Sequence, residues 1–129
     1  MSQVWMFPCR IQFFDVIDFF NDHDVVLWNQ PNDISEDDTV FIYVGAPLSC
    51  IMFRCKIKQL DVKDKDIINN NSYAVRPKNN QKFMQLERVK VFEEEKWKIQ
   101  LLREYGHGQF QKQCKVNGSL AELLLKDDI

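Results

Sequence analysis

The sequence predicts an α+β fold, a small β-barrel or sheet with helices packed on it. The main observation is Asp38–Gln59, which has the pattern of two strands joined by a tight turn. The first of these strands is apolar on both faces, so both faces have to be covered. The second observation is the aromatic content, because ten Phe among 129 residues supply a substantial apolar core.

Side chains alternate along a strand, and this hairpin is predicted to place them on two faces. In the first strand, one face receives Val40, Ile42 and Val44, and the other receives Phe41 and Tyr43. The turn is Gly45–Leu48, where glycine and proline are typical. In the second strand, one face receives Ile51, Phe53, Cys55 and Ile57, and the other receives Met52, Arg54, Lys56 and Lys58.

The N-terminal third is predicted to form a strand, a helix and a second strand. Gln3–Cys9 is a strand that we expect to end at or before Pro8. Asp15 is the expected N-cap of a helix, with Phe14 and Phe19 as a hydrophobic staple. An apolar stripe is expected from Phe13, Val16, Ile17 and Phe20. Val25–Trp28 is then a short buried strand.

The second half contains weaker signals. Asp61–Gln81 is polar and poorly patterned, and we interpret it as a long loop. Phe83–Phe92 is a strand whose alternation changes phase, so a β-bulge is expected near Glu87-Arg88. A helix is expected over Lys96–Tyr105, with Glu93–Glu95 as its acidic first turn. An extended segment over Gln109–Val116 follows. The last expected element is a helix over Leu120–Leu125, capped by Ser119.

Length and composition predict one domain covering residues 1–129. No apolar run is long enough to span a membrane, and no signal peptide begins the sequence. The four cysteines are scattered, so we expect them reduced in a cytoplasmic compartment. Residues 1–72 carry six Lys/Arg against eleven Asp/Glu, whereas residues 73–118 carry ten against five. That basic segment is either ordinary solvated surface or a face that contacts phosphates.

No motif for catalysis, a metal or a cofactor is present, so we expect a protein that is not an enzyme. His23 and His107 have no ligand-like spacing to a cysteine or carboxylate. Asp37 and Asp38 are a carboxylate pair, but a turn that enters a strand explains them more simply. What remains is aromatic: Trp5 and Trp28 are either core residues or the walls of a pocket that stacks a flat base.

The sequence resembles the EVE domains of the PUA-like superfamily, which are related to YTH, ASCH and SRA-type domains. Four stretches carry this resemblance: VWMFPC with FDVIDFF, the short strand ending at Trp28 with Gln30, Ile34–Ile57, and LLREYG with QKQCKVNGSLAELL. It is most similar to the modules found at the front of modification-dependent restriction enzymes. The 129 residues hold no nuclease or ATPase domain, so we expect the cutting activity of fused relatives to be absent.

The resemblance implies a small, mostly closed β-barrel and a pocket for a modified base. In that pocket Trp5 and Trp28 would be walls, Phe14 or Phe13 would close it, and Gln30 would hydrogen-bond the base edge or the backbone. Tyr43 and Phe53 would either line the floor or pack in the core. The implied partners are DNA or RNA with a modified base, together with a fused or separate effector nuclease. The expected phosphate contacts are Arg54, Lys56, Lys58, Arg76, Lys78 and Arg88.

Two alternatives remain open at this point. One is a protein-interaction or small-nucleotide-binding module, which the acidic first half would serve equally well. Binding to a nucleic-acid polymer would weaken steeply with salt, whereas binding to a small nucleotide would do so only slightly. The other is an RNA-modifying or hydrolytic enzyme, for which no nucleophile or metal constellation is found.

Overall fold

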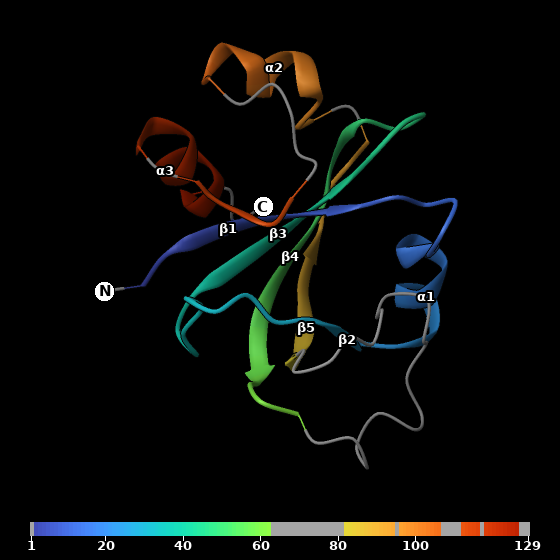
Figure 1. Ribbon diagram of the computed structural model, residues 1–129. Helices are drawn as coiled ribbons and strands as arrows, with labels where there is room; N and C mark the ends of the chain where they lie inside the picture. Colours follow the sequence, from blue (N-terminus) through green and yellow to red (C-terminus); the bar gives the residue numbers. More distant parts are fainter. Residues whose placement is uncertain (1, 63–81, 95, 107–111, 117, 127–129) are drawn as a thin grey trace.

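A computed structural model describes residues 2–62, 82–94, 96–106, 112–116 and 118–126. These residues form an α+β fold with six strands and three helices (Figure 1). In chain order the elements are β1 (Val4–Cys9), α1 (Val16–Asp22), β2 (Val25–Asn29), β3 (Thr39–Val44), β4 (Cys50–Gln59), β5 (Phe83–Val91), α2 (Ile99–Glu104), β6 (Cys114–Val116) and α3 (Gly118–Lys126).

The strands make one curved sheet in the order β2-β5-β4-β3-β1-β6. β1 and β3 run parallel, with Val4 opposite Thr39 and Cys9 opposite Val44. The other neighbouring strands are antiparallel. Because β1 and β3 are parallel, their carboxyl ends meet at one edge of the sheet, next to the loop that leads into α1.

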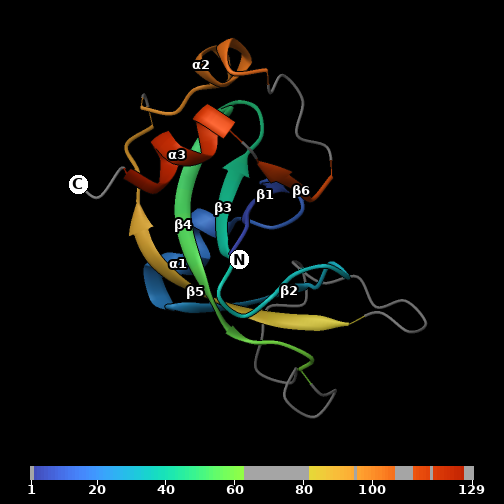
Figure 2. The same cartoon turned by 90° about the vertical axis from the view of Figure 1, so that its left-hand side faces the viewer.

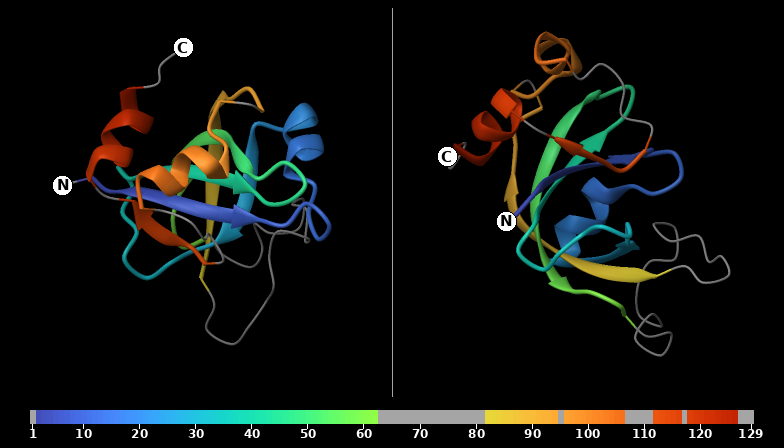
Figure 3. Two further views of the ribbon diagram at one scale, coloured as in Figure 1. Left: turned by 90° about the horizontal axis from the view of Figure 1, so that it is seen from above. Right: turned by 60° about the vertical axis from the view of Figure 1, so that its left-hand side comes forward.

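Each face of the sheet packs against different helices. Val16 and Phe20 of α1 belong to an inner core with Trp5, Phe7 and Trp28. α2 and α3 cover the opposite face, where they form an outer core. Figure 2 and the right-hand view of Figure 3 show α1 on one side of the sheet and both C-terminal helices on the other. The outer core contains Val4, Met6, Phe41, Tyr43, Ile51, Phe92, Trp97, Ile99, Leu102, Val116, Leu120 and Leu124.

The predicted hairpin is confirmed, and in β3 the predicted faces are confirmed as well. Val40, Ile42 and Val44 enter the inner core, while Phe41 and Tyr43 enter the outer one. In β4 the prediction of regular alternation is wrong. Ile42 pairs with Phe53 but Tyr43 pairs with Ile51, so Met52 is the extra residue of a bulge. Ile51 therefore faces the outer core, and Met52 joins Phe53 in the inner one.

The bulge expected in β5 is present, one residue beyond the expected pair. Cys55 pairs with Arg88 and Arg54 pairs with Lys90, which leaves Val89 as the extra residue. β1 differs from its prediction, because it continues through Pro8, which lies opposite Tyr43. Proline lacks an N–H, but β6 pairs with Val4–Met6, so within the described part of the chain no strand pairs with Pro8 on the β6-facing side of β1.

Helix α1 begins as predicted and α2 does not. Asp15 caps α1 by accepting a hydrogen bond from the Asp18 backbone N–H at 3.0 Å, and the Phe14 and Phe19 rings pack 5.5 Å apart. Phe13 is not part of the apolar stripe, since it is 53% exposed. The helix expected over Lys96–Tyr105 is shortened to Ile99–Glu104, because Lys98 bridges to Cys50 in an extended conformation.

The C-terminal elements also differ in their bounds. β6 is confined to Cys114–Val116, whereas residues 107–111 lie outside the described residues. α3 begins at Gly118, so Ser119 lies inside the helix and is not its cap. Most of the loop expected over Asp61–Gln81 also lies outside the described residues.

The predicted closed barrel is wrong: the sheet is open between its edge strands β2 and β6. Among the described residues no backbone pairing joins them, and side chains connect the two edges instead. Gln113 Nε2, next to β6, donates to the Asn29 carbonyl of β2 at 2.8 Å. Lys115 of β6 reaches Asp33, beyond β2, at 3.3 Å. The sheet is thus curled far enough for side chains to bridge its two edges.

Candidate functional site

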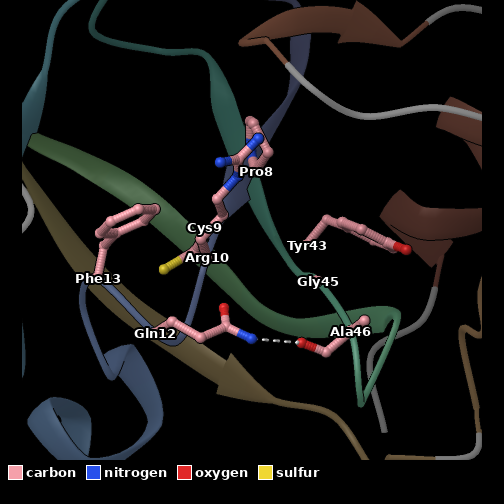
Figure 4. A pocket seen from close by; sticks show the side chains of 8 residues that line it. All are labelled: Pro8, Cys9, Arg10, Gln12, Phe13, Tyr43, Gly45 and Ala46. Atoms are coloured by element: carbon pink, nitrogen blue, oxygen red, sulfur yellow. Dashed lines mark hydrogen bonds between the residues drawn. The ribbon is translucent and has the colours of Figure 1, made fainter.

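A cavity of about 560 Å³ opens at the carboxyl ends of β1 and β3. One wall is the segment that leaves β1 and enters α1, and the other is the turn between β3 and β4 (Figure 4). The lining residues are Pro8, Cys9, Arg10, Gln12, Phe13, Tyr43, Gly45 and Ala46. A volume of this size matches that of a small-ligand pocket.

Backbone hydrogen bonds hold both walls. In the first, the N–H groups of Phe13 and Phe14 donate to the Arg10 carbonyl at 3.0 and 3.1 Å. In the second, the Ser49 N–H donates to the Gly45 carbonyl at 3.2 Å. The Gly45 N–H donates to the Cys9 carbonyl at 3.0 Å, which ties the two walls together at the base of the cavity. The side chains at the mouth are therefore displayed from an ordered backbone.

The side chains at the mouth combine aromatic, cationic and amide groups. The Arg10 guanidinium lies 5.9 Å from the centre of the exposed Phe13 ring, within the range of a cation–π contact. The Gln12 amide donates across the mouth to the Ala46 carbonyl at 3.4 Å, as Figure 4 shows. No Asp or Glu is among the lining residues, so the local charge favours an anionic or neutral ligand.

Two titratable groups in the cavity have raised pKa values. Burial raises the pKa of the Cys9 thiol to about 12, and this thiol donates to the Phe14 carbonyl at 3.3 Å. Burial also raises the pKa of the Tyr43 hydroxyl, opposed by a hydrogen bond with Ser49 and by the charge of Arg103. Both groups are protonated near neutral pH, so Cys9 is a poor nucleophile and Tyr43 offers a neutral hydroxyl.

Two more cations lie around this end of the sheet. Lys98 Nζ donates to the Leu48 carbonyl in the β3–β4 turn at 3.4 Å. Arg103 of α2 is exposed and acts electrostatically on Tyr43. Together with Arg10 they place three cations around the cavity, whereas the carboxylate of Asp15 is near enough to act electrostatically on the Cys9 thiol.

The structure buries the two predicted tryptophan walls separately. Trp5 is 4% exposed and Trp28 is 6% exposed. Phe7 packs against both, with ring centroids 6.2 Å away in each case, so its ring occupies space that a base would need. Trp5 Nε1 also donates to the buried Asp38 carboxylate at 3.0 Å. Both tryptophans lie in the inner core and neither lines the cavity.

The remaining predicted pocket residues divide between core and cavity. Phe14 packs against Trp28, and Phe53 packs against Phe20, in the inner core. Gln30 makes a reciprocal pair with Asp61: its Oε1 accepts from the Asp61 N–H at 2.8 Å, and its Nε2 donates to the carboxylate at 3.1 Å. Two predicted pocket residues line the cavity: Tyr43, and Phe13, which the resemblance offered as an alternative to Phe14 for closing the pocket.

The two predicted arginine contacts within the described residues have internal partners. Arg88 forms a 2.8 Å ion pair with Asp24, donates to the Phe20 carbonyl and lies 5.6 Å from the Phe20 ring centre. It therefore fastens the C-terminal end of α1 to β5. Arg54 donates to the Leu125 carbonyl of α3 at 3.3 Å.

The other predicted phosphate contacts lie far from the cavity or outside the described residues. Lys56 and Lys58 are exposed near the far end of β4, and Lys56 lies 3.5 Å from Glu87. Because Lys56 is opposite Thr39, at the start of β3, it is separated from the cavity by the length of β3, roughly 20 Å for a six-residue strand. Arg76 and Lys78 lie outside the described residues.

Sequence reasoning missed Arg10, Gln12 and Ala46 as site residues. Arg10 and Gln12 occupy the polar connection between a strand and a helix, and Ala46 lies in a turn that was interpreted only as a turn. The available signal was the order of elements: connections at the carboxyl end of parallel strands form ligand sites in many open sheets. Using it required the parallel pairing of β1 with β3, which the sequence did not predict.

Among the residues that the structure describes, no group of three or more His, Cys, Asp or Glu side chains is placed to hold a metal ion. The described helices are all too short or too polar to cross a bilayer.

Similar folds occur among solved structures. The crystal structure of ASCH from Zymomonas mobilis is similar with a TM-score of 0.59 and 11% identity, covering 97% of this chain and 95% of that chain. A point variant of the same protein gives a TM-score of 0.60 at 9% identity, with 96% and 95% covered. This chain has an ASCH-like fold. ASCH domains are among the relatives that the sequence resemblance named, and the similarity found here is one of fold.

A third solved structure has a similar fold, whereas neither comparison by sequence gives a match. A hypothetical protein from Leishmania major shares the ASCH-like fold, with a TM-score of 0.58 at 14% identity, covering 98% of this chain and 94% of that one. No protein-family model matches the sequence, and no curated protein matches it. The more specific resemblance to EVE domains stays a prediction.

Proposed function

We propose that this domain binds single-stranded or locally opened nucleic acid and takes one base into the cavity at the carboxyl ends of β1 and β3. The observation that carries the proposal is Phe13, an aromatic ring 53% exposed at the mouth of a cavity and paired with Arg10. An exposed ring is a stacking platform for a base, and the adjacent guanidinium is suited to a phosphate oxygen. The ASCH-like fold supports the proposal, since PUA-like folds include RNA-binding domains.

Base stacking and phosphate contacts would both contribute to the binding free energy. A base stacked on an aromatic ring contributes about 1–3 kcal/mol. Arg10, Lys98 and Arg103 then supply phosphate contacts around the cavity, and each contact makes binding salt-dependent. Lys56 and Lys58 are about 20 Å away, so they would contact only a strand several nucleotides longer.

A modified base is the more specific form of this proposal. Pro8 and Cys9 give the cavity an apolar wall, against which a methyl group would be buried. One buried methyl contributes about 0.8 kcal/mol, a preference of roughly fourfold. A larger preference would require contacts with more of the methyl surface.

The test is fluorescence polarisation with labelled RNA and DNA pentanucleotides carrying unmodified, 5-methyl, 5-hydroxymethyl or N-methyl bases. Phe13→Ala should weaken binding about tenfold or more, because it removes the stacking surface while leaving the core intact. Tyr105→Ala is the matched control, since Tyr105 is also an exposed aromatic residue but lies on the C-cap of α2. Equal affinities for the two variants would refute the proposal.

A second comparison tests the phosphate contacts. Arg10→Ala should lower the slope of log affinity against log salt by about one, whereas Lys126→Ala on α3 should leave it unchanged. If nucleoside monophosphates bind as tightly as the pentanucleotides, with little salt dependence, the ligand is a small nucleotide rather than a polymer. That outcome would favour the alternative function that the composition leaves open.

A further inference from the structure

The Gln12–Ala46 hydrogen bond crosses the mouth of the cavity between its two walls. Its length, 3.4 Å, is beyond the 2.7–3.2 Å range of ordinary N–H···O bonds, and both groups are exposed. A ligand can therefore displace it at small cost. Figure 4 shows Gln12 and Ala46 facing each other across the opening.

The two partners differ in mobility. The Ala46 carbonyl belongs to a turn held by the Gly45 and Ser49 N–H groups, so it stays in position when its partner leaves. Gln12 is a flexible side chain whose amide both donates and accepts. A ligand at the mouth would therefore meet one stationary acceptor and one adjustable amide.

A stationary backbone carbonyl distinguishes amino groups from oxo groups, because it accepts hydrogen bonds and cannot donate them. Adenine and cytosine present an exocyclic amine beside an unprotonated ring nitrogen on their pairing edge. Hypoxanthine, guanine and uracil present an oxo group beside a ring N–H. An amine would replace Gln12 Nε2 as the donor to Ala46, whereas an oxo group would be repelled by it.

We propose that the cavity selects bases with an exocyclic amine beside an unprotonated ring nitrogen on the pairing edge, which are adenine and cytosine but not guanine. The Ala46 carbonyl accepts from the amine, and Gln12 is the specificity residue that donates to the adjacent ring nitrogen. This inference rests on the proposed function and names the class of base that the same cavity takes. It predicts that the amine, rather than ring size, decides binding. Both a purine and a pyrimidine should therefore be accepted.

Two pairs of nucleotides isolate the amine. IMP carries an oxo group and a ring N–H where AMP carries an amino group and an unprotonated ring nitrogen. UMP differs from CMP in the same way. Isothermal titration calorimetry should show about tenfold tighter binding of AMP over IMP and of CMP over UMP. Pentanucleotides with four abasic sites and one central base should follow the same order.

Substitution of Gln12 tests its role directly. Gln12→Glu replaces the donating amide by an acceptor, so it should abolish most of the preference for AMP and CMP. Gln100→Glu is the control, because it makes the same change of charge at an exposed position on α2. Circular dichroism of both variants should match that of the unmodified protein, since both positions are exposed.

The outcomes separate this inference from the proposed function. An amine preference that Gln12→Glu removes and Gln100→Glu keeps supports the inference. Binding that requires Phe13 but is equal for AMP and IMP, and for CMP and UMP, overturns the inference and leaves the proposed function standing. Binding that is absent, or unaffected by Phe13→Ala, overturns both.

Discussion

Asp38 accepts a hydrogen bond from the buried Trp5 indole, so its substitution tests whether Trp5 is a structural core residue. Its carboxylate is 3% exposed and accepts three hydrogen bonds. The donors are the Gln3 backbone N–H at 2.8 Å, the Ser35 backbone N–H at 2.9 Å and Trp5 Nε1 at 3.0 Å. Asp38→Ala would leave all three donors without this acceptor.

The magnitude follows from the burial of each donor. A buried donor left unsatisfied costs about 1–3 kcal/mol, and the Trp5 indole is the most buried of the three. Water can reach the other two more easily, because their hydrogen bonds are only partly buried. We therefore expect Asp38→Ala to lower the free energy of unfolding by about 3–5 kcal/mol, a large part of the stability of a domain of this size.

The assay is urea denaturation followed by tryptophan fluorescence. With a slope of about 1–3 kcal/mol per molar urea, the midpoint should fall by roughly 2 M. The adjacent Asp37 is exposed, so Asp37→Ala should change stability by less than about 0.5 kcal/mol. If the two variants are equally stable, the reasoning is refuted, and Trp5 would again be a candidate for the wall of a base pocket.

Three further predictions concern packing and titration. Arg88→Met should lower the free energy of unfolding by about 1–2 kcal/mol, because it removes the ion pair with Asp24 and the hydrogen bond to the Phe20 carbonyl. It should leave the salt dependence of nucleic-acid binding unchanged, and a lower salt slope would show that Arg88 contacts phosphate. Gln113→Ala should speed amide hydrogen exchange along β2 by freeing the Asn29 carbonyl; unchanged exchange would mean that this bond does not hold the sheet edges together. Burial raises the pKa of both Cys9 and Cys55 above the ordinary 9.0, so around pH 9–10 their thiols stay protonated in the folded state but ionise in the unfolded state. Their contribution to stability is therefore complete below pH 9, and the free energy of unfolding should fall by about 1–3 kcal/mol by pH 10. The Cys9→Ala, Cys55→Ala double variant should show a flatter profile in denaturation at each pH, and an equally steep one would contradict this cause.

Trp5→Ala and Trp28→Ala have a different meaning in this structure from the one the sequence predicted. If the two side chains were pocket walls, as the resemblance implied, either substitution would abolish binding while the fold survived. Both side chains are buried in the inner core, where a Trp→Ala change costs about 3–5 kcal/mol. Binding lost in either variant would therefore report unfolding, and Phe13→Ala is the informative substitution.

Local patterns in the sequence determined much of the secondary structure. Alternation alone assigned Val40 and Phe41 to opposite faces, because the side-chain period of a strand is two. Asp15 was identified as a cap because its carboxylate reaches the N–H three residues along the chain, a contact within one turn. These features depend on neighbours a few residues apart, which the sequence displays directly.

Tertiary structure decided the features that depend on distant partners. The bulge at Met52 arises from the register between β4 and β3, which no local pattern specifies. Trp5 is in the core because Asp38, thirty-three positions away, accepts from its indole. The cavity likewise exists because parallel pairing of β1 with β3 brings Gln12 next to Ala46, thirty-four positions along the chain. Aromatic composition suggested a base-binding pocket, but only the tertiary structure shows that Phe13 is exposed and lines a cavity.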